Sequence, residues 1–142
     1  WIDGPGDSNG DGFVDYARAN RRGLVNQGWK DSHDSIFHED GRMAEQPIAL
    51  VEVQGYVYAA RLAMSWLANR RNDTARAREW QRRAKALLAE VERRFWLPDL
   101  GFYAIALDGA GRPCRVRASN PGHLLYSRLP SPQRAATTPK PL

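Results

Sequence analysis

The stretch PIALVEVQGYVYAARLAMSWLAN, residues 47–69, decides the fold because it predicts a long helix that is apolar on most of its sides. Pro47 suits a first helical turn, where a missing N–H costs nothing. The apolar residues form two lines at helical spacing, Leu50, Val53, Val57, Ala60, Met64 and Leu67 on one side and Ile48, Val51, Tyr58, Leu62 and Trp66 on another. We therefore expect the helix to be buried on most sides.

A second helix is predicted over residues 74–95, and it has a single apolar face. Asp73 is a suitable N-cap, and Pro98 ends the pattern. Its apolar face carries Trp80, Ala84, Leu87, Leu88, Val91 and Phe95 between charged residues. A buried helix joined by a short polar turn to a half-exposed one is typical of the inner and outer layers of an α/α toroid. Each helix pair of such a ring is covered by its neighbours.

The remaining segments predict little regular structure. Residues 101–107 and 112–117 alternate around Asp108-Gly109, which predicts a β-hairpin. A short helix is expected over residues 124–129, with Asn120 as its cap or, together with His123, near a substrate. We expect residues 130–142 to form a poorly structured tail, and we interpret the chain as an excerpt of a longer protein because it starts at Trp1.

Composition excludes several classes of function. The net charge of +5 and the pI near 9.8 come largely from arginines of one amphipathic segment, which indicates a solvated helix face and no nucleic-acid partner. Cys114 is the only cysteine, so the chain has no internal disulfide and no cysteine metal cluster. No apolar run is long enough for a membrane span. A soluble, cytoplasmic location is the default expectation.

Residues 26–35, NQGWKDSHDS, combine an indole ring, amides, a histidine and two carboxylates without helical or strand periodicity. We call this segment the acidic loop. Loops of this composition often bind ligands. A sugar would stack on Trp29, bond its hydroxyls to Asn26 and Gln27, and receive a proton from Asp31. The alternative, an Asx-rich turn that caps the next helix, has equal weight on spacing alone.

Two apparent metal patterns are better explained as turns. Residues 7–15 match the first half of a calcium loop, but Arg18 stands where the closing carboxylate belongs, so we predict a turn and a short strand over 13–16. His33 and His38 are five residues apart, whereas paired helical ligands are commonly four apart. We expect His33 to orient Asp34 or a sugar hydroxyl and His38 to lie on the surface. No metal and no cofactor are expected.

The run GLVNQGWKDSHDSIFHEDGRMAEQPIALVEVQGYVY, residues 23–58, resembles the amylo-alpha-1,6-glucosidase (glycogen-debranching-like) branch of the six-hairpin glycosidases. The resemblance extends more weakly over residues 7–129. It implies that residues 1–129 are part of an (α/α)6 toroid of mainly α class with a small β-hairpin. It also implies an inverting glycoside hydrolase for oligo- or polysaccharides, with Asp31 as the general acid and Trp29 beside the bound glucosyl unit.

The composition of the chain and the family resemblance together give the other candidate residues of the site. Glu52 lies near the start of the first helix, where it either contacts substrate or its neighbours or simply suits the helix dipole. In the resembled family the general base is a later glutamate, so no residue of this chain is given that role. The expected partner is a carbohydrate, and the substrate-binding candidates are Asn26, Gln27, Trp29, His33, Asp34 and Glu52.

Two other classes of function stay open from the sequence. A carbohydrate-binding or structural fragment would keep Trp29 and the loop amides without activity. A basic helical module would use arginines such as Arg82 and Arg83 to contact RNA or an acidic protein.

Overall fold

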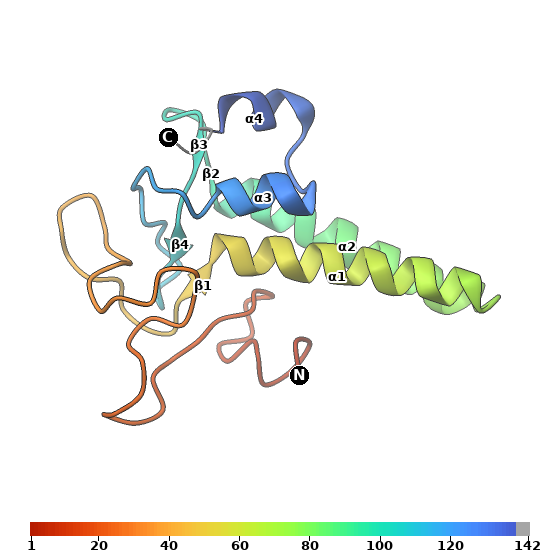
Figure 1. Cartoon of the computed structure of the whole chain (residues 1–142), viewed down its shortest axis with the longest axis horizontal. Helices are drawn as coiled ribbons and strands as arrows, with labels where there is room; N and C mark the ends of the chain where they lie inside the picture. The colour runs from red at the N-terminus through yellow and green to blue at the C-terminus, as the bar shows by residue number, and fades with distance from the viewer. Residues whose placement is uncertain (139–142) are drawn as a thin grey trace.

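The structure is a computed structural model that describes residues 1–138, and two long helices dominate it. Helices α1 (Val51–Arg70) and α2 (Thr74–Arg94) run antiparallel and side by side (Figure 1). The Ser65 hydroxyl of α1 donates to the carbonyl of Ala77 in α2 at 2.8 Å. Both helices were predicted, and the expectation of a mainly α chain is confirmed. No helix in the described part is both long and apolar enough to span a membrane.

The turn between the two helices forms as predicted. The Asp73 side chain accepts a hydrogen bond from the backbone N–H of Arg76 at 3.0 Å, so it is the N-cap of α2. Asn72 has a φ of 59°, a left-handed conformation that asparagine tolerates better than most residues. Helix α1 starts later than the sequence predicted because residues 49–50 pair with another segment as a strand.

Four short strands make two small antiparallel pairs. Strand β1 (Ala49–Leu50) pairs with β4 (Ala106–Leu107), and β2 (Trp96–Leu97) pairs with β3 (Phe102–Tyr103). The predicted hairpin over 101–117 persists only near its turn, where the Cys114 N–H donates to the carbonyl of Ala106 at 2.8 Å. The segment divides its hydrogen bonds among several partners, so its return arm does not form a full strand.

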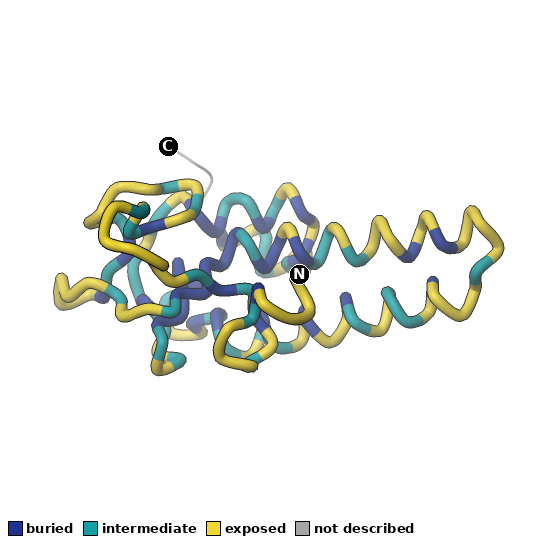
Figure 2. Tube along the Cα trace, turned by 90° about the horizontal axis from the view of Figure 1, so that it is seen from below, coloured by how far each residue is buried: buried dark blue, intermediate teal, exposed yellow. Residues whose placement is uncertain are grey.

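The core lies at the end of the helix pair where the strands and loops meet. Phe13 and Phe95 are fully buried there and pack edge to face with ring centroids 5.2 Å apart. Buried residues gather at this end, which we call the strand end, and the opposite end is largely exposed (Figure 2). The strand end therefore holds most of the apolar surface that stabilises the chain.

The outer half of α1 corrects one expectation. We predicted burial on most sides, yet Met64, Trp66 and Leu67 are exposed, and 61% of the Trp66 surface is accessible. In this half of α1, α2 covers one side and the N-terminal residues reach Arg61, which pairs with Asp3 at 2.6 Å, but much of the apolar surface stays uncovered. The prediction that the helix is apolar on most sides holds, and its uncovered flank is the surface that a neighbouring helix pair of a toroid would cover.

The segment after residue 120 is more helical than expected. Helix α3 (Gly122–Ser127) packs against α1, and α4 (Pro132–Thr137) follows it. The Ser131 hydroxyl caps α4 by accepting from the Arg134 N–H at 3.3 Å, and Pro132 occupies the first turn. The tail predicted over 130–142 is therefore ordered as far as this helix, and its last residues, 139–142, lie outside the described part.

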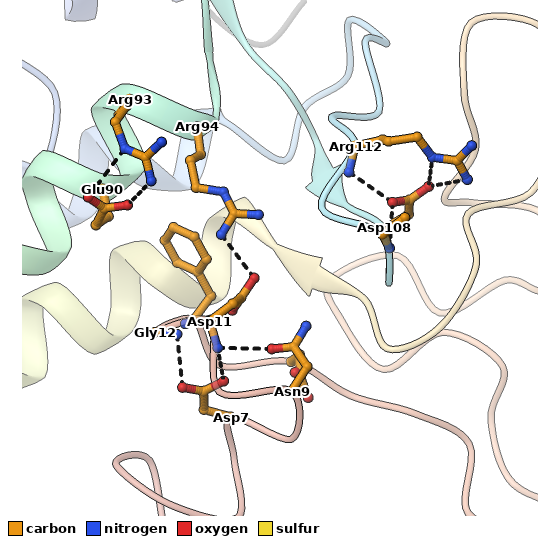
Figure 3. Close-up of polar contacts among 12 residues, drawn as sticks. Asp7, Asn9, Asp11, Gly12, Glu90, Arg93, Arg94, Asp108 and Arg112 are labelled. Atoms are coloured by element: carbon orange, nitrogen blue, oxygen red, sulfur yellow. Dashed lines mark hydrogen bonds and ion pairs between the residues drawn. The ribbon is translucent and has the colours of Figure 1, made fainter.

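The glycine-rich segment near the N-terminus forms a turn, as interpreted. The Asp7 carboxylate accepts the backbone N–H groups of Asp11 and Gly12 at 3.0 and 2.9 Å, and Asp11 also pairs with Arg94 (Figure 3). The strand predicted over 13–16 reduces to one bridge between Tyr16 and Ile48. Within residues 1–138, no group of three or more acidic, histidine or cysteine side chains is arranged to hold a metal ion.

Candidate active site

The acidic loop is shaped by a buried asparagine. The Asn26 amide donates to the carbonyl of Ser32 at 2.6 Å and to the hydroxyl of Ser35 at 3.1 Å. Its oxygen accepts from the Tyr16 hydroxyl at 2.8 Å. Because both amide hydrogens already have partners within the loop, Asn26 supports the loop, and any effect it has on a sugar acts through the loop shape.

The side chains proposed for sugar contact lie on the outside of the loop. Gln27, Asp31, His33 and Asp34 are exposed, and 67% of the Trp29 surface is accessible. The candidate acid and the candidate stacking ring are therefore both accessible and lie two residues apart on the same loop. The turn interpretation also holds in part, because the Ser35 N–H donates to the carbonyl of Ser32.

The Trp29 ring packs against His123, and His123 is hydrogen-bonded to Tyr56. The His123 ring of α3 lies 5.0 Å from the Trp29 ring, centroid to centroid. The Tyr56 hydroxyl of α1 forms a 2.6 Å hydrogen bond with Nδ1 of His123. Loop, α1 and α3 therefore meet at His123. His123 was a candidate site residue from the sequence, whereas Tyr56 was not. Tyr56 ends the segment EVQGY, residues 52–56, and this was the only feature of the sequence that pointed to it.

Glu52 lies buried beneath the loop and is only 1% exposed. Asn120 donates its amide N–H to Oε1 of Glu52 at 2.8 Å, which contradicts its predicted role as the cap of α3. Burial raises the pKa of the Glu52 carboxyl, and this outweighs the hydrogen bonds and the nearby His123 that lower it. The carboxyl is therefore out of reach of solvent in this structure.

The loop backbone passes closely over the start of α1. A Cβ added at Gly28 would lie 2.1 Å from Cδ1 of Leu50 and 3.1 Å from Oε1 of Glu52. Only a residue without a side chain fits this approach. One turn further along α1, the Gln54 amide donates to the carbonyl of Val14 at 2.7 Å and accepts from the Val14 N–H at 3.0 Å. Gln54 thus ties the N-terminal segment to α1.

His38 corrects the expectation that it lies on the surface. It is 9% exposed, and its Nε2 lies 3.1 Å from the Asp108 carboxylate. Arg112 bonds the same carboxylate (Figure 3). Burial raises the pKa of Asp108, but hydrogen bonds from Arg112 and the loop backbone hold it below its usual value. The buried Cys114 lies beside His38, and burial raises its pKa to about 12, so the thiol stays protonated and inert.

The structure also contains hollows away from the acidic loop. One of about 530 Å³ lies between the N-terminal residues and the helix pair, lined by Trp1, Arg61, Met64 and Trp80 among others. Another of about 340 Å³ is lined by His38, Arg42, Arg112 and Arg115 among others. Neither of these two hollows is lined by a residue of the acidic loop, whose exposed side chains form its open face.

The comparisons with known proteins decide the family. Residues 9–139 match the family model described as "Mannosylglycerate hydrolase MGH1-like glycoside hydrolase domain". The chain belongs to this family. The match covers the acidic loop, α1, α2 and the segment with Asn120 and His123. A search of curated proteins found no match.

Family membership confirms the coarser part of the resemblance. The chain is a glycoside hydrolase domain of six-hairpin glycosidase type, and its mainly helical architecture with small strand pairs is consistent with part of a helical toroid. The match supports the superfamily and does not extend to the amylo-alpha-1,6-glucosidase branch.

Proposed function

We propose that Asp31 is the general acid of a glycoside hydrolase and that Trp29 stacks on the sugar whose bond is cleaved. The observation that carries the proposal is the pairing of an accessible carboxyl and an accessible indole on one loop of a glycoside hydrolase domain. The Asn26 amide bonds the loop to itself, and His123 packs against Trp29, so the loop backbone and the indole ring have defined neighbours. Fixed positions are what proton transfer to a leaving oxygen requires.

The proposed chemistry begins when a sugar covers the loop. An apolar sugar face on Trp29 displaces water from Asp31, and removal from water favours the protonated form of a carboxyl. Asp31 then donates its proton to the glycosidic oxygen as the bond to the anomeric carbon breaks. Gln27, His33 and Asp34 are exposed on the same loop and supply hydrogen bonds for sugar hydroxyls.

The second carboxylate of the reaction is not assigned to this chain. We propose an inverting mechanism, in which acid and base stand about 6.5–9.5 Å apart to admit a water molecule. Asp34 is three residues from Asp31 in the same loop, and nothing places it on the opposite face of a sugar. Glu52 is buried beneath the loop. The base is therefore expected from sequence outside residues 1–142, and the chain alone is expected to be inactive.

Two substrate classes follow from the two sources of evidence. The resemblance of residues 23–58 favours α-1,6-linked glucosyl units of an oligo- or polysaccharide. The name of the matched family instead suggests a small mannoside of glycerate as a substrate to compare. The open face of the acidic loop admits either, and the longer saccharide remains our first choice.

The test is hydrolysis by the protein with its natural flanking sequence, assayed on an isomalto-oligosaccharide and on mannosylglycerate. Asp31→Asn should lower kcat/KM by about 1,000-fold or more, because general acid catalysis contributes roughly 10²–10⁴-fold. Asp40→Asn is the matched control, since Asp40 is an exposed carboxylate paired with Arg42 on the next turn. NMR of the first-formed anomer reports inversion. An Asp31→Asn protein that keeps its activity would overturn the role of Asp31.

A carbohydrate-binding role without catalysis is the second candidate, favoured by the open face of the loop. Isothermal titration of the chain with gluco-oligosaccharides tests it, and Trp29→Ala should abolish the binding heat. The basic-helix alternative has less support, because Arg82 and Arg83 both pair with Glu79 of the same helix. This pairing accords with a solvated helix face.

A further inference from the structure

Two buried polar side chains, Glu52 and Asn120, meet beneath the acidic loop, and one oxygen of each has no hydrogen-bond partner among the described residues. Glu52 and Asn120 are 68 residues apart in sequence and are 1% and 0% exposed. One hydrogen bond of 2.8 Å joins them, from Nδ2 of Asn120 to Oε1 of Glu52. The other oxygen of each group, Oε2 of Glu52 and Oδ1 of Asn120, is buried without a partner among the described residues. Orphaned buried oxygens of this kind are costly and call for an explanation.

One proton accounts for both orphaned oxygens. If Glu52 is ionised, Oε2 and Oδ1 are both acceptors and neither can satisfy the other. If Oε2 carries a proton, it becomes a donor, and the unpaired acceptor belongs to the amide that is already bonded to the same carboxyl group. The two side chains then share two hydrogen bonds, one in each direction, as a carboxylic acid and an amide do in an apolar medium.

We propose that Glu52 and Asn120 form such a side-by-side acid–amide pair, and that Glu52 is thereby a positioning residue for the acidic loop. The contacts around the pair show how it reaches the loop. Gly28 lies directly on Leu50 and Glu52, and the backbone of Trp29 is among the groups that lower the pKa of the Glu52 carboxyl. The pair therefore joins α1, the start of α3 and the loop that carries Asp31.

The groups around Glu52 are consistent with a neutral carboxyl. Burial raises its pKa. Tyr16 and Tyr56 both lie close enough for a negative Glu52 to raise their pKa values further, and His123 is the one basic group that acts on it. The His123 ring is already bonded to Tyr56 through Nδ1, so it supplies no donor to Oε2 through that nitrogen.

The first test measures the loop itself and does not depend on catalysis. Hydrogen exchange of peptides covering 26–35 is compared in wild type, Glu52→Ala, Glu52→Gln and Asn120→Ala. Glutamine can both accept from and donate to Asn120, so it rebuilds the two-bond pair without a titrating proton. We expect about tenfold faster exchange in the two alanine variants, since loss of a buried pair costs about one or two hydrogen bonds. Glu52→Gln should restore protection, and peptides covering 60–75 should be unchanged in all variants.

The second test uses pH. A carboxyl whose pKa is raised by folding binds more protons in the folded state, so its favourable contribution is complete below the unfolded pKa and is lost as pH rises through the folded pKa. Urea unfolding should therefore show wild type losing stability with rising pH relative to Glu52→Gln. A difference that does not change with pH, or that changes in the opposite direction, would contradict a protonated Glu52.

The third test rests on the proposed function and separates positioning from chemistry. In the active protein, Glu52→Ala should lower kcat by about 30–100-fold with little change in KM, because displacing a catalytic group by about 1 Å lowers the rate by that order. Glu52→Gln should recover most of that loss. If Glu52→Gln is as inactive as Glu52→Ala, the ionised carboxylate itself is required and the pairing proposal is wrong. If Asp31→Asn remains active, the proposed function fails, while hydrogen exchange still decides the pair.

Discussion

Both ends of the α1–α2 pair carry large apolar residues, but the segments that surround the two ends differ. At the strand end, the N-terminal turn, the short strands and α3 all cover the helices, and residues such as Phe13, Phe95 and Leu124 are completely buried. At the other end, which we call the turn end, α1 and α2 pack on each other, and Trp66 is 61% exposed. The acidic loop lies at the strand end. The candidate site and most of the buried apolar surface therefore lie at the same end of the molecule.

This difference teaches that apolar residues in a helix stabilise only where another segment covers them. The candidate site benefits because its loop is anchored on the best-packed part of α1. A carboxyl on such a loop can be exposed and still be well positioned. The following variants test this contrast between the two ends.

The largest difference in stability is expected between one buried and one exposed aromatic ring. Phe95→Ala should lower the free energy of unfolding by about 3–5 kcal/mol, because it removes a fully buried ring and leaves a cavity beside Phe13. Trp66→Ala is the matched variant at the turn end and should change it by only about 0.5 kcal/mol. Urea unfolding followed by circular dichroism measures both. Equal losses would show that the turn end is packed against something in solution.

A smaller effect, on activity, is expected where the loop crosses the helix. Gly28→Ala places a methyl group 2.1 Å from Leu50, so the acidic loop must move away from α1. We expect kcat/KM to fall by about 100-fold, the order of loss for a displacement of about 1 Å. Gly4→Ala is the control, since nothing lies within 4 Å of its added Cβ. Unchanged activity in Gly28→Ala would separate the loop position from catalysis.

The third variant tests a buried amide at the strand end. Gln54→Ala removes hydrogen bonds to both backbone groups of Val14 and leaves these partly buried groups without that partner. The free energy of unfolding should fall by about 2 kcal/mol, the usual cost of unsatisfied buried polar groups. Gln54→Glu provides a second comparison, because it keeps the acceptor and loses the amide donor when ionised. Denaturant midpoints measure both variants.

The smallest effect is expected at the cap of α2. Asp73→Ala removes the acceptor for the Arg76 N–H and should cost about 1 kcal/mol. Asp73→Asn keeps a capping oxygen and should cost much less. Thermal unfolding compares the two. A loss in Asp73→Ala as large as that in Phe95→Ala would mean that the turn end contributes more to stability than its exposure indicates.

Local signals in the sequence were sufficient for the helices and for the candidate loop. The spacing of apolar residues over 47–69 and 74–95, with Asp73 before the second run, predicted α1 and α2 to within a few residues. The Gly28–Trp29–Asp31 cluster marked the loop as a candidate site, and the family match covers these residues. Such features depend on neighbours within a few residues, so the chain order already contains them.

Long-range pairing could not be derived in the same way. Nothing near Asn120 indicated that it bonds Glu52, and a helix cap was the natural local alternative. His38 looked like a surface residue in an acidic turn until the fold placed Asp108 beside it. The segment 102–107 alternates like a hairpin arm, yet its last two residues pair with β1, which is distant in the sequence.

By itself, the sequence determined the two long helices, the cap between them and an acidic loop with a glycosidase signature. The tertiary structure alone decided that α1 stays exposed at the turn end, that Tyr56 and His123 support Trp29, and that Glu52 is buried against Asn120. The physical reason is that helix periodicity and capping arise from contacts within about one turn, whereas burial and polar pairing depend on which distant segments cover a residue.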